Sequence, residues 1–198
     1  MTEYQRLRRL VLAALISIIA LFLVFGASIH SENTHERIEW VGQMLILIGI
    51  GGRLWSTLYI GGRKSSEVVQ TGPYSVTRNP LYFFSAVAAA GVGGQMGSVA
   101  LAVAFGILCW VAFSIVIRRE EGFLSAKLGQ PYLDYVARVP RFLPNPSLYR
   151  DEEFVTFRPT LLSRTLKDGL AFFISVPLFE LIETLQGSGV IPVFFHLW

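Results

Sequence analysis

The chain has 198 residues, of which 53% are hydrophobic and 16% are charged, whereas about a quarter are charged in a typical soluble domain. Apolar runs of about 20 residues exclude an ordinary water-soluble core and predict helices that cross a bilayer. The small net charge of +3 gives no support for nucleic-acid binding. The single cysteine, Cys109, excludes an intrachain disulfide and a multi-cysteine metal site, and we expect no metal centre.

Five apolar stretches follow one another, so we expect one integral-membrane domain over residues 1–198. The predicted fold class is all-α, a polytopic membrane helical bundle of about five transmembrane helices with a connector helix at the cytoplasmic face. The first stretch, 10–29, resembles a signal peptide in its charges, but its length favours an uncleaved helix. The second to fifth stretches are 38–60, 81–94, 99–117 and 169–198. Glu180, Glu183 and a Gly-Ser-Gly sequence interrupt the last, which is either one tilted span or a broken, partly re-entrant one.

Basic residues gather on one predicted side of the membrane. Three lie before the first stretch, three between the second and third, and nine between the fourth and fifth, together 15 of the 17. The positive-inside rule therefore predicts a cytoplasmic N-terminus and an outward C-terminus. We expect an integral protein of a bacterial inner (plasma) membrane, with its chemistry at the cytoplasmic surface.

Arg53 lies within the second stretch, about seven residues from its cytoplasmic end. A charge inside a span is costly and is usually kept where it faces a partner or a cavity. One interpretation is an anion anchor for a lipid-like substrate. The other is an arginine that extends to the headgroups or pairs internally, because seven residues rise only roughly 10 Å along a helix.

The third stretch begins with helix-start residues. Pro80 suits the first turn, and Asn79 before it is a good N-cap. A helix N-terminus beside Arg78 is also an anion site, and Tyr82 would project from its first turn. At the same membrane face, Glu120 and Glu121 follow the fourth stretch. They are either interfacial anchors or carboxylates that, together with this anion site, hold a zwitterion with hydroxyl groups.

Residues 129–144 predict a short surface helix that Pro140 ends. Tyr132, Tyr135 and Arg138 recur at three-residue spacing and therefore share one face. This helix is either an interfacial anchor or a lid over a pocket at membrane level.

In this order, the motifs resemble the isoprenylcysteine carboxyl methyltransferase and phospholipid methyltransferase superfamily over about residues 49–144. The matching motifs are Gly52-Arg53-x-Trp55, Gly72-Pro73-Tyr74, Arg78-Asn79-Pro80-Leu81-Tyr82, Glu120-Glu121, Gly129-x-x-Tyr132-x-x-Tyr135 and Val139-Pro140-Arg141-Phe142. The resemblance implies a membrane enzyme that takes S-adenosylmethionine from the cytoplasm and a lipophilic or lipid-linked acceptor from the bilayer. It implies a cofactor pocket formed by Arg78, Asn79, Pro80, Tyr82, Glu120 and Glu121, with Tyr132, Tyr135 and Arg141 as further contacts.

The chain departs from the family pattern at two positions. Asn79 replaces the histidine of the motif and loses a titratable ring, and Phe84 replaces its closing glycine. A Gly91-x-Gly93 pair is similar to a nucleotide-binding motif, but it lies roughly 16 Å along the helix from Pro80. Small residues at a helix interface explain this pair better.

Methyl transfer from a sulfonium to a carboxylate depends mostly on positioning and needs no general base. No catalytic residue is therefore assigned, and Arg53 with Trp55 is the candidate for orienting the acceptor. Two alternatives are an NADPH-dependent membrane reductase of the sterol-reductase kind and a non-catalytic transport or scaffold subunit. The acceptor, the atom that is methylated and the oligomeric state are left open.

Overall fold

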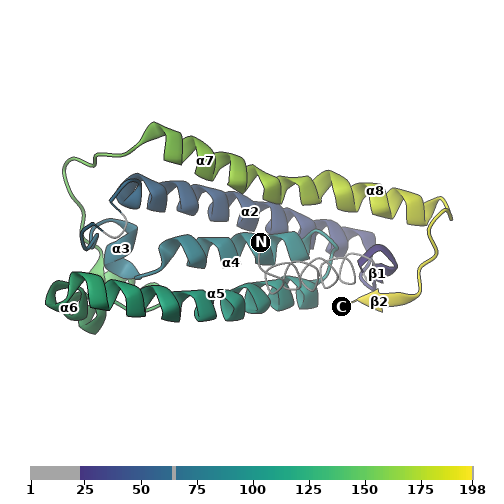
Figure 1. Cartoon of the computed structure of the whole chain (residues 1–198). Helices are drawn as coiled ribbons and strands as arrows, with labels where there is room; N and C mark the ends of the chain where they lie inside the picture. Colours follow the sequence, from purple (N-terminus) through teal and green to yellow (C-terminus); the bar gives the residue numbers. More distant parts are fainter. Residues whose placement is uncertain (1–22, 64–65, 198) are drawn as a thin grey trace, which may run out of the picture.

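The computed structural model describes residues 23–63 and 66–197 (Figure 1). Most of the first predicted span, 10–29, lies outside these residues. Within it, residues 26–28 form a strand, so the prediction of a helix as far as residue 29 is wrong. The elements are β1 (Gly26–Ser28), α2 (Glu32–Ile60), α3 (Pro73–Val76), α4 (Pro80–Gly94), α5 (Val99–Leu128), α6 (Gln130–Arg138), η1 (Pro146–Leu148), α7 (Pro159–Leu170), η2 (Ala171–Ile174), α8 (Ser175–Gly187) and β2 (Phe195–Leu197).

The long helices lie beside one another and give the described part of the chain two distinct ends (Figure 1). At the α3–α6 end, α2 passes into α3, and α5 passes into α6. At the β1–β2 end, the turn between α4 and α5 lies near the short parallel pair of β1 and β2, in which Gly26 faces Phe195. The predicted all-α class is supported, with this two-stranded pair as a small addition.

Helices α2 and α4 pack with their backbones in close approach. A Cβ on Gly91 would lie 2.5 Å from the carbonyl oxygen of Gly42, and a Cβ on Gly49 would lie 2.6 Å from the Cβ of Ala88. Small residues of this kind allow membrane helices to approach closely. The structure therefore confirms that Gly91 is an interface residue. It also shows where Phe84 fits, because its ring lies directly over Gly52.

Two helices, α2 and α5, are long and apolar enough to cross a bilayer, and α4 is a shorter apolar helix of 15 residues. Both long helices carry large apolar side chains on their exposed faces, among them Trp40 and Ile48 on α2 and Leu108 on α5. Exposed apolar faces of this extent suit a lipid environment. These helices indicate a membrane protein, whereas the total of five spans stays a prediction.

Further predicted helix boundaries differ from the structure, and α2 already begins at Glu32, before the predicted 38. Helix α5 does not end near Ile117 but continues to Leu128, so Glu120 and Glu121 lie within the helix. Ile117 and Glu121 are one turn apart, and Leu124 and Leu128 continue the same side toward the pocket described below. The last segment starts as a helix at Pro159, ten residues before the predicted boundary, and is broken by the 3₁₀ turn η2.

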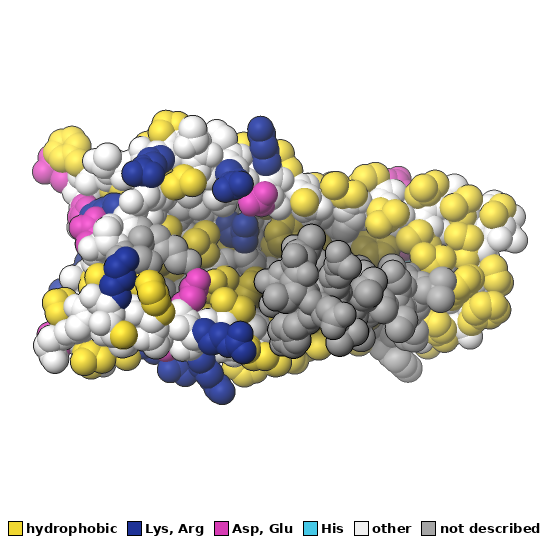
Figure 2. Space-filling view, in the orientation of Figure 1, with side chains coloured by type: hydrophobic (Ala, Val, Ile, Leu, Met, Phe, Trp, Pro, Cys, Tyr) yellow, Lys and Arg dark blue, Asp and Glu magenta, His cyan; other side chains and the backbone are white. Residues whose placement is uncertain are grey.

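On the face drawn in Figure 2, the Lys and Arg side chains lie over the half of the bundle toward α3 and α6, with a few Asp and Glu among them, whereas the β1–β2 end is mostly apolar. The uneven charge seen along the sequence is therefore an uneven charge along the bundle. An uneven distribution of this kind is what the positive-inside rule relates to the orientation of a membrane protein.

The close approach of α2 and α4 makes a stability prediction. Gly49→Ala should lower the free energy of unfolding by about 1–3 kcal/mol, because its Cβ would also lie 2.7 Å from the carbonyl oxygen of Phe84. Gly51→Ala is the matched control, since nothing lies within 4 Å of its Cβ. It should leave stability unchanged or raise it slightly. Thermal unfolding in detergent measures both, and equal melting temperatures for the two variants would contradict the proposed packing.

Candidate functional site

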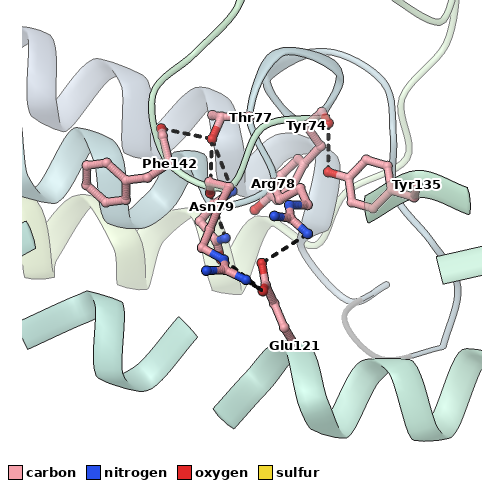
Figure 3. A network of polar contacts seen from close by, with 8 residues as sticks. Tyr74, Thr77, Arg78, Asn79, Glu121, Tyr135 and Phe142 are labelled. Carbon is pink, nitrogen blue, oxygen red and sulfur yellow. Dashed lines mark hydrogen bonds and ion pairs between the residues drawn. The ribbon is translucent and has the colours of Figure 1, made fainter. Parts of the chain in front are cut away.

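An ion-pair network joins the segment before α4, helix α5 and the segment after α6. Arg78 Nη1 lies 3.4 Å from Glu121 Oε1, and Arg141 Nη2 lies 2.9 Å from Glu121 Oε2 (Figure 3). The side chains of Arg78 and Glu121 are 7% and 12% exposed, whereas that of Arg141 is 50% exposed. One carboxylate thus faces two guanidinium groups, which leaves the network with an excess positive charge.

Backbone contacts hold this network in place. The Arg78 amide donates to the Pro140 carbonyl at 2.9 Å, and Thr77 Oγ1 donates to the Phe142 carbonyl at 3.0 Å (Figure 3). Asn79 is the N-cap of α4, but its side chain does not cap the helix. Its Nδ2 donates instead to the Arg141 carbonyl at 2.9 Å, so the predicted capping role is corrected. Pro80 occupies the first helical turn as predicted and is fully buried.

Some buried polar atoms of the network lack hydrogen bonds within the described part of the chain. They are Arg78 Nε, Arg78 Nη1 and Glu121 Oε1. The 3.4 Å contact between Arg78 and Glu121 is therefore an ion pair without hydrogen-bond geometry. Buried polar groups are almost always satisfied, so donors left open on a buried arginine indicate a site for an anionic or polar ligand.

Tyrosines from α3 and α6 form the neighbouring wall. Tyr135 and Tyr132 are buried, and Tyr135 donates its hydroxyl hydrogen to the Tyr74 carbonyl at 2.7 Å (Figure 3). Burial, followed by the negative charge of Glu121, raises the pKa of Tyr132 to about 12. Burial, with Tyr135 and Glu120 nearby, raises the pKa of Tyr74 well above its ordinary value. At neutral pH these groups are uncharged, which makes them hydrogen-bonding and water-excluding groups rather than bases.

Arg53 extends the site along α2 toward the middle of the bundle. Its Nη1 donates to Ser85 Oγ on α4, and Ser85 donates in turn to the Leu81 carbonyl at 2.8 Å. Arg53 Nε is buried and has no hydrogen bond in the described part of the chain. A second arginine with an open donor therefore lies at a different depth from Arg78.

These groups enclose a cavity of about 310 Å³, at the lower end of the range for small-molecule sites. The predicted site residues that line it are Arg53, Arg78, Asn79, Tyr82, Glu120, Glu121, Tyr132 and Tyr135. The other predicted residues do not line it. Pro80 shapes the start of α4, Arg141 pairs with Glu121 from outside, and the Trp55 ring packs against Phe84 and Tyr149.

Comparison with known proteins shows the family of the chain. A family model described as phospholipid methyltransferase matches residues 38–130, which include most of α2 and all of α4 and α5. The chain is 31% identical over 186 residues to the nickel-cobalt-cadmium resistance protein NccN of Alcaligenes xylosoxydans xylosoxydans, covering 90% of this chain and 84% of that protein. The chain belongs to the phospholipid methyltransferase family. The resemblance inferred from its motifs is thereby confirmed.

Two further relatives differ in their names. The chain is 31% identical over 159 residues to the cobalt-zinc-cadmium resistance protein CzcN of Cupriavidus metallidurans, covering 77% of this chain and 73% of that protein. It is 26% identical over 98 residues to protein-S-isoprenylcysteine O-methyltransferase B of Arabidopsis thaliana, covering 50% of each chain. No solved structure matches the chain. The family and the plant relative suggest a membrane methyltransferase.

Several lining residues were not predicted as part of the site. Tyr74 belongs to the quoted Gly72-Pro73-Tyr74 motif, so a signal for it existed. Ser85 lies one turn beyond Leu81, and the polar side chain in an apolar run was a usable signal. Thr165 comes from α7, outside the matched family region, and its hydroxyl lies 3.0 Å from that of Thr57. Nothing in the local sequence indicates that contact.

The network makes a prediction about buried and exposed ion pairs. Glu121→Gln should lower the free energy of unfolding by about 3 kcal/mol, because it removes the carboxylate that pairs with buried Arg78. In Glu67→Gln, by contrast, an exposed ion pair with Arg63 is removed, since the Glu67 side chain is 52% exposed. This variant should lower the free energy of unfolding by less than about 1 kcal/mol. Denaturant unfolding in detergent micelles measures both variants. A Glu121→Gln variant as stable as Glu67→Gln would show that the network does not support the fold.

Proposed function

We propose that the protein is an S-adenosylmethionine-dependent methyltransferase that acts on a lipophilic acceptor in a bacterial inner membrane. The observation that carries the proposal is the pair of open, buried donors on Arg78 inside the family-matched cavity. They suit the carboxylate of an amino-acid moiety. The proposed orientation has the N-terminus and the α3–α6 end in the cytoplasm, since basic side chains gather at that end.

The residues present fit the cofactor. Arg78 would bind its carboxylate, while Glu120 and Glu121 would accept hydrogen bonds from its amino and hydroxyl groups. The buried hydroxyl of Tyr132 would contact it, and Tyr135, whose hydroxyl bonds the Tyr74 carbonyl, would hold α6 over the site. When bound, S-adenosylmethionine supplies an electrophilic methyl group on a sulfonium.

The acceptor would enter from the bilayer side, where Arg53 lies. Arg53 is seven residues before the end of α2, a rise of roughly 10 Å, so it lies deeper in the bundle than the cofactor-binding end of the cavity. An acceptor carboxylate or phosphate held there would have its apolar tail among membrane helices. The side chains of Leu81 and Phe113 line the cavity and would exclude water from the reacting groups.

The first test measures cofactor binding. S-adenosylhomocysteine should raise the melting temperature of the purified full chain, because a ligand that binds only the folded state stabilises it. Arg78→Gln should weaken this binding at least tenfold, the scale of a lost charge-assisted hydrogen bond. Lys127→Gln, which removes the same charge from α5 outside the cavity, should change it less than twofold. Stabilisation by NADPH and not by S-adenosylhomocysteine would favour the reductase alternative and refute the proposal.

The second test separates acceptor binding from cofactor binding. With methyl-labelled S-adenosylmethionine and membranes, the wild-type protein should label a lipid-extractable product. Arg53→Gln should reduce labelling at least tenfold while affinity for S-adenosylhomocysteine stays within twofold, since Arg53 would orient only the acceptor. The label also identifies whether oxygen, nitrogen or sulfur is methylated. Equal labelling by Arg53→Gln and the wild type would remove Arg53 from the acceptor site.

The names of two relatives support a second candidate function, a role in resistance to divalent transition-metal ions. Expression in a metal-sensitive bacterium should then raise tolerance of Co²⁺ or Cd²⁺. Loss of that tolerance in Arg78→Gln would link it to the methyltransferase cavity. Unchanged growth in the presence of the metals would contradict this role.

A further inference from the structure

A second polar cluster lies at the β1–β2 end, away from the cavity. His35 Nε2 lies 2.9 Å from Glu183 Oε1 and 3.4 Å from Glu39 Oε1. One ligand atom from each residue lies within 4.8 Å of the other two. His35 is 18 residues before Arg53 on α2, a rise of roughly 27 Å, so the cluster is separate from the Arg78 cavity.

The fold holds the three side chains in place from several sides. His35 and Glu39 are one turn apart on α2, and Glu183 is on α8. Gly97 supports the imidazole, because a Cβ there would lie 2.1 Å from His35 Nδ1, and its φ of +58° suits glycine. Gln95 Nε2 donates to the Glu39 carbonyl at 3.1 Å, which fixes this part of α2 against the α4–α5 turn.

The negative charge of the cluster favours a bound cation. Two carboxylates face one imidazole nitrogen, and Glu36 and Glu180 add negative charge nearby. His35 Nε2 is buried, yet among the described residues it makes no hydrogen bond of acceptable geometry, even to the carboxylate 2.9 Å away. Two carboxylates held beside one imidazole nitrogen are unfavourable unless a positive charge, either a proton on that nitrogen or a metal ion, lies between them.

The ligand set selects the kind of cation. One imidazole nitrogen with two carboxylate oxygens suits Zn²⁺ and similar transition-metal ions, whereas Ca²⁺ and Mg²⁺ prefer oxygen ligands alone. Neighbouring ligands around a tetrahedral Zn²⁺ are about 3.3 Å apart, which is close to both histidine–glutamate separations. A cavity of about 160 Å³, lined by His35, Glu183, Met96 and Gln186, would leave room for water as a fourth ligand.

We propose that His35, Glu39 and Glu183 bind one divalent transition-metal cation of the Zn²⁺ class at the β1–β2 end of the bundle. The site joins α2 to α8, two helices that come together here from distant parts of the sequence. A bound ion would therefore fix α8 against α2. The proposal is independent of the proposed methyltransferase activity, because it involves none of the residues around Arg78.

The test uses the full chain, purified without a histidine tag and treated with chelator. Titration with Co²⁺ should give the visible absorption bands of a four-coordinate ion at one equivalent. Zn²⁺ should remove these bands, and Mg²⁺ in excess should not. Zn²⁺ should also raise the melting temperature. The absence of both the Co²⁺ bands and the Zn²⁺ stabilisation in the wild-type protein would overturn the proposal and leave a protonated His35 as the cation of the cluster.

Matched variants locate the ion. His35→Gln and Glu183→Gln should each weaken Co²⁺ binding at least tenfold, because each removes one of three protein ligands. The controls His196→Gln and Glu36→Gln make the same changes at the same end and should stay within twofold. A cooperative thermal unfolding transition of metal-free His35→Gln, at a melting temperature close to that of the metal-free wild type, reports that the variant is folded. Wild-type Co²⁺ affinity in His35→Gln would refute the site, whether or not the methyltransferase proposal holds.

Discussion

The close approach of α2 and α4 is the constraint on which the rest of the described structure depends. Gly42, Gly49 and Gly52 on α2 face Gly91, Ala88 and Phe84 on α4, with no space for larger side chains. Lipid gives helices no hydrophobic reason to associate, so contact between backbones has to come from packing of this kind. The same contact brings Arg53 to Ser85 near one end and Glu39 to Gln95 near the other. Both polar clusters therefore depend on one apolar interface.

Local patterns in the sequence predict much of this arrangement, because membrane helices and helix starts leave local signals. Apolar runs located α2, α4 and part of α5, and the Asn79-Pro80 pair located the start of α4. The end of α5 was misplaced because four adjacent charges from Arg118 to Glu121 look like a membrane boundary. The helix continues because Leu124 and Leu128 keep its inner side apolar toward the cavity, a pattern that is visible only when the partner of that face is known.

Contacts between distant segments could not be predicted in the same way. Thr165 and Glu183 reach α2 only because α7, η2 and α8 run along that helix, and no local pattern specifies such a path. Asn79 shows the same limit at short range. Its position at the helix start was predicted, but its side chain bonds the Arg141 carbonyl because the segment after α6 folds back beside it. Site residues within motifs could therefore be predicted from the sequence, whereas those that a distant segment brings to the site when the chain folds could not.

Charge balance connects the cavity to its proposed ligands. Glu121 lies between Arg78 and Arg141, and Glu120 also lines this end of the cavity, so a ligand there would meet both a guanidinium group and carboxylates. Arg53 donates to the neutral Ser85, and the nearby Asp168 carboxylate adds negative charge. A guanidinium held inside a helix bundle is costly, and a helix usually keeps one only for a partner or a cavity. Two arginines at different depths, each with an open donor, would accommodate two anionic groups at once. That is the requirement of an enzyme that brings a polar cofactor from the cytoplasm to an acidic acceptor in the bilayer.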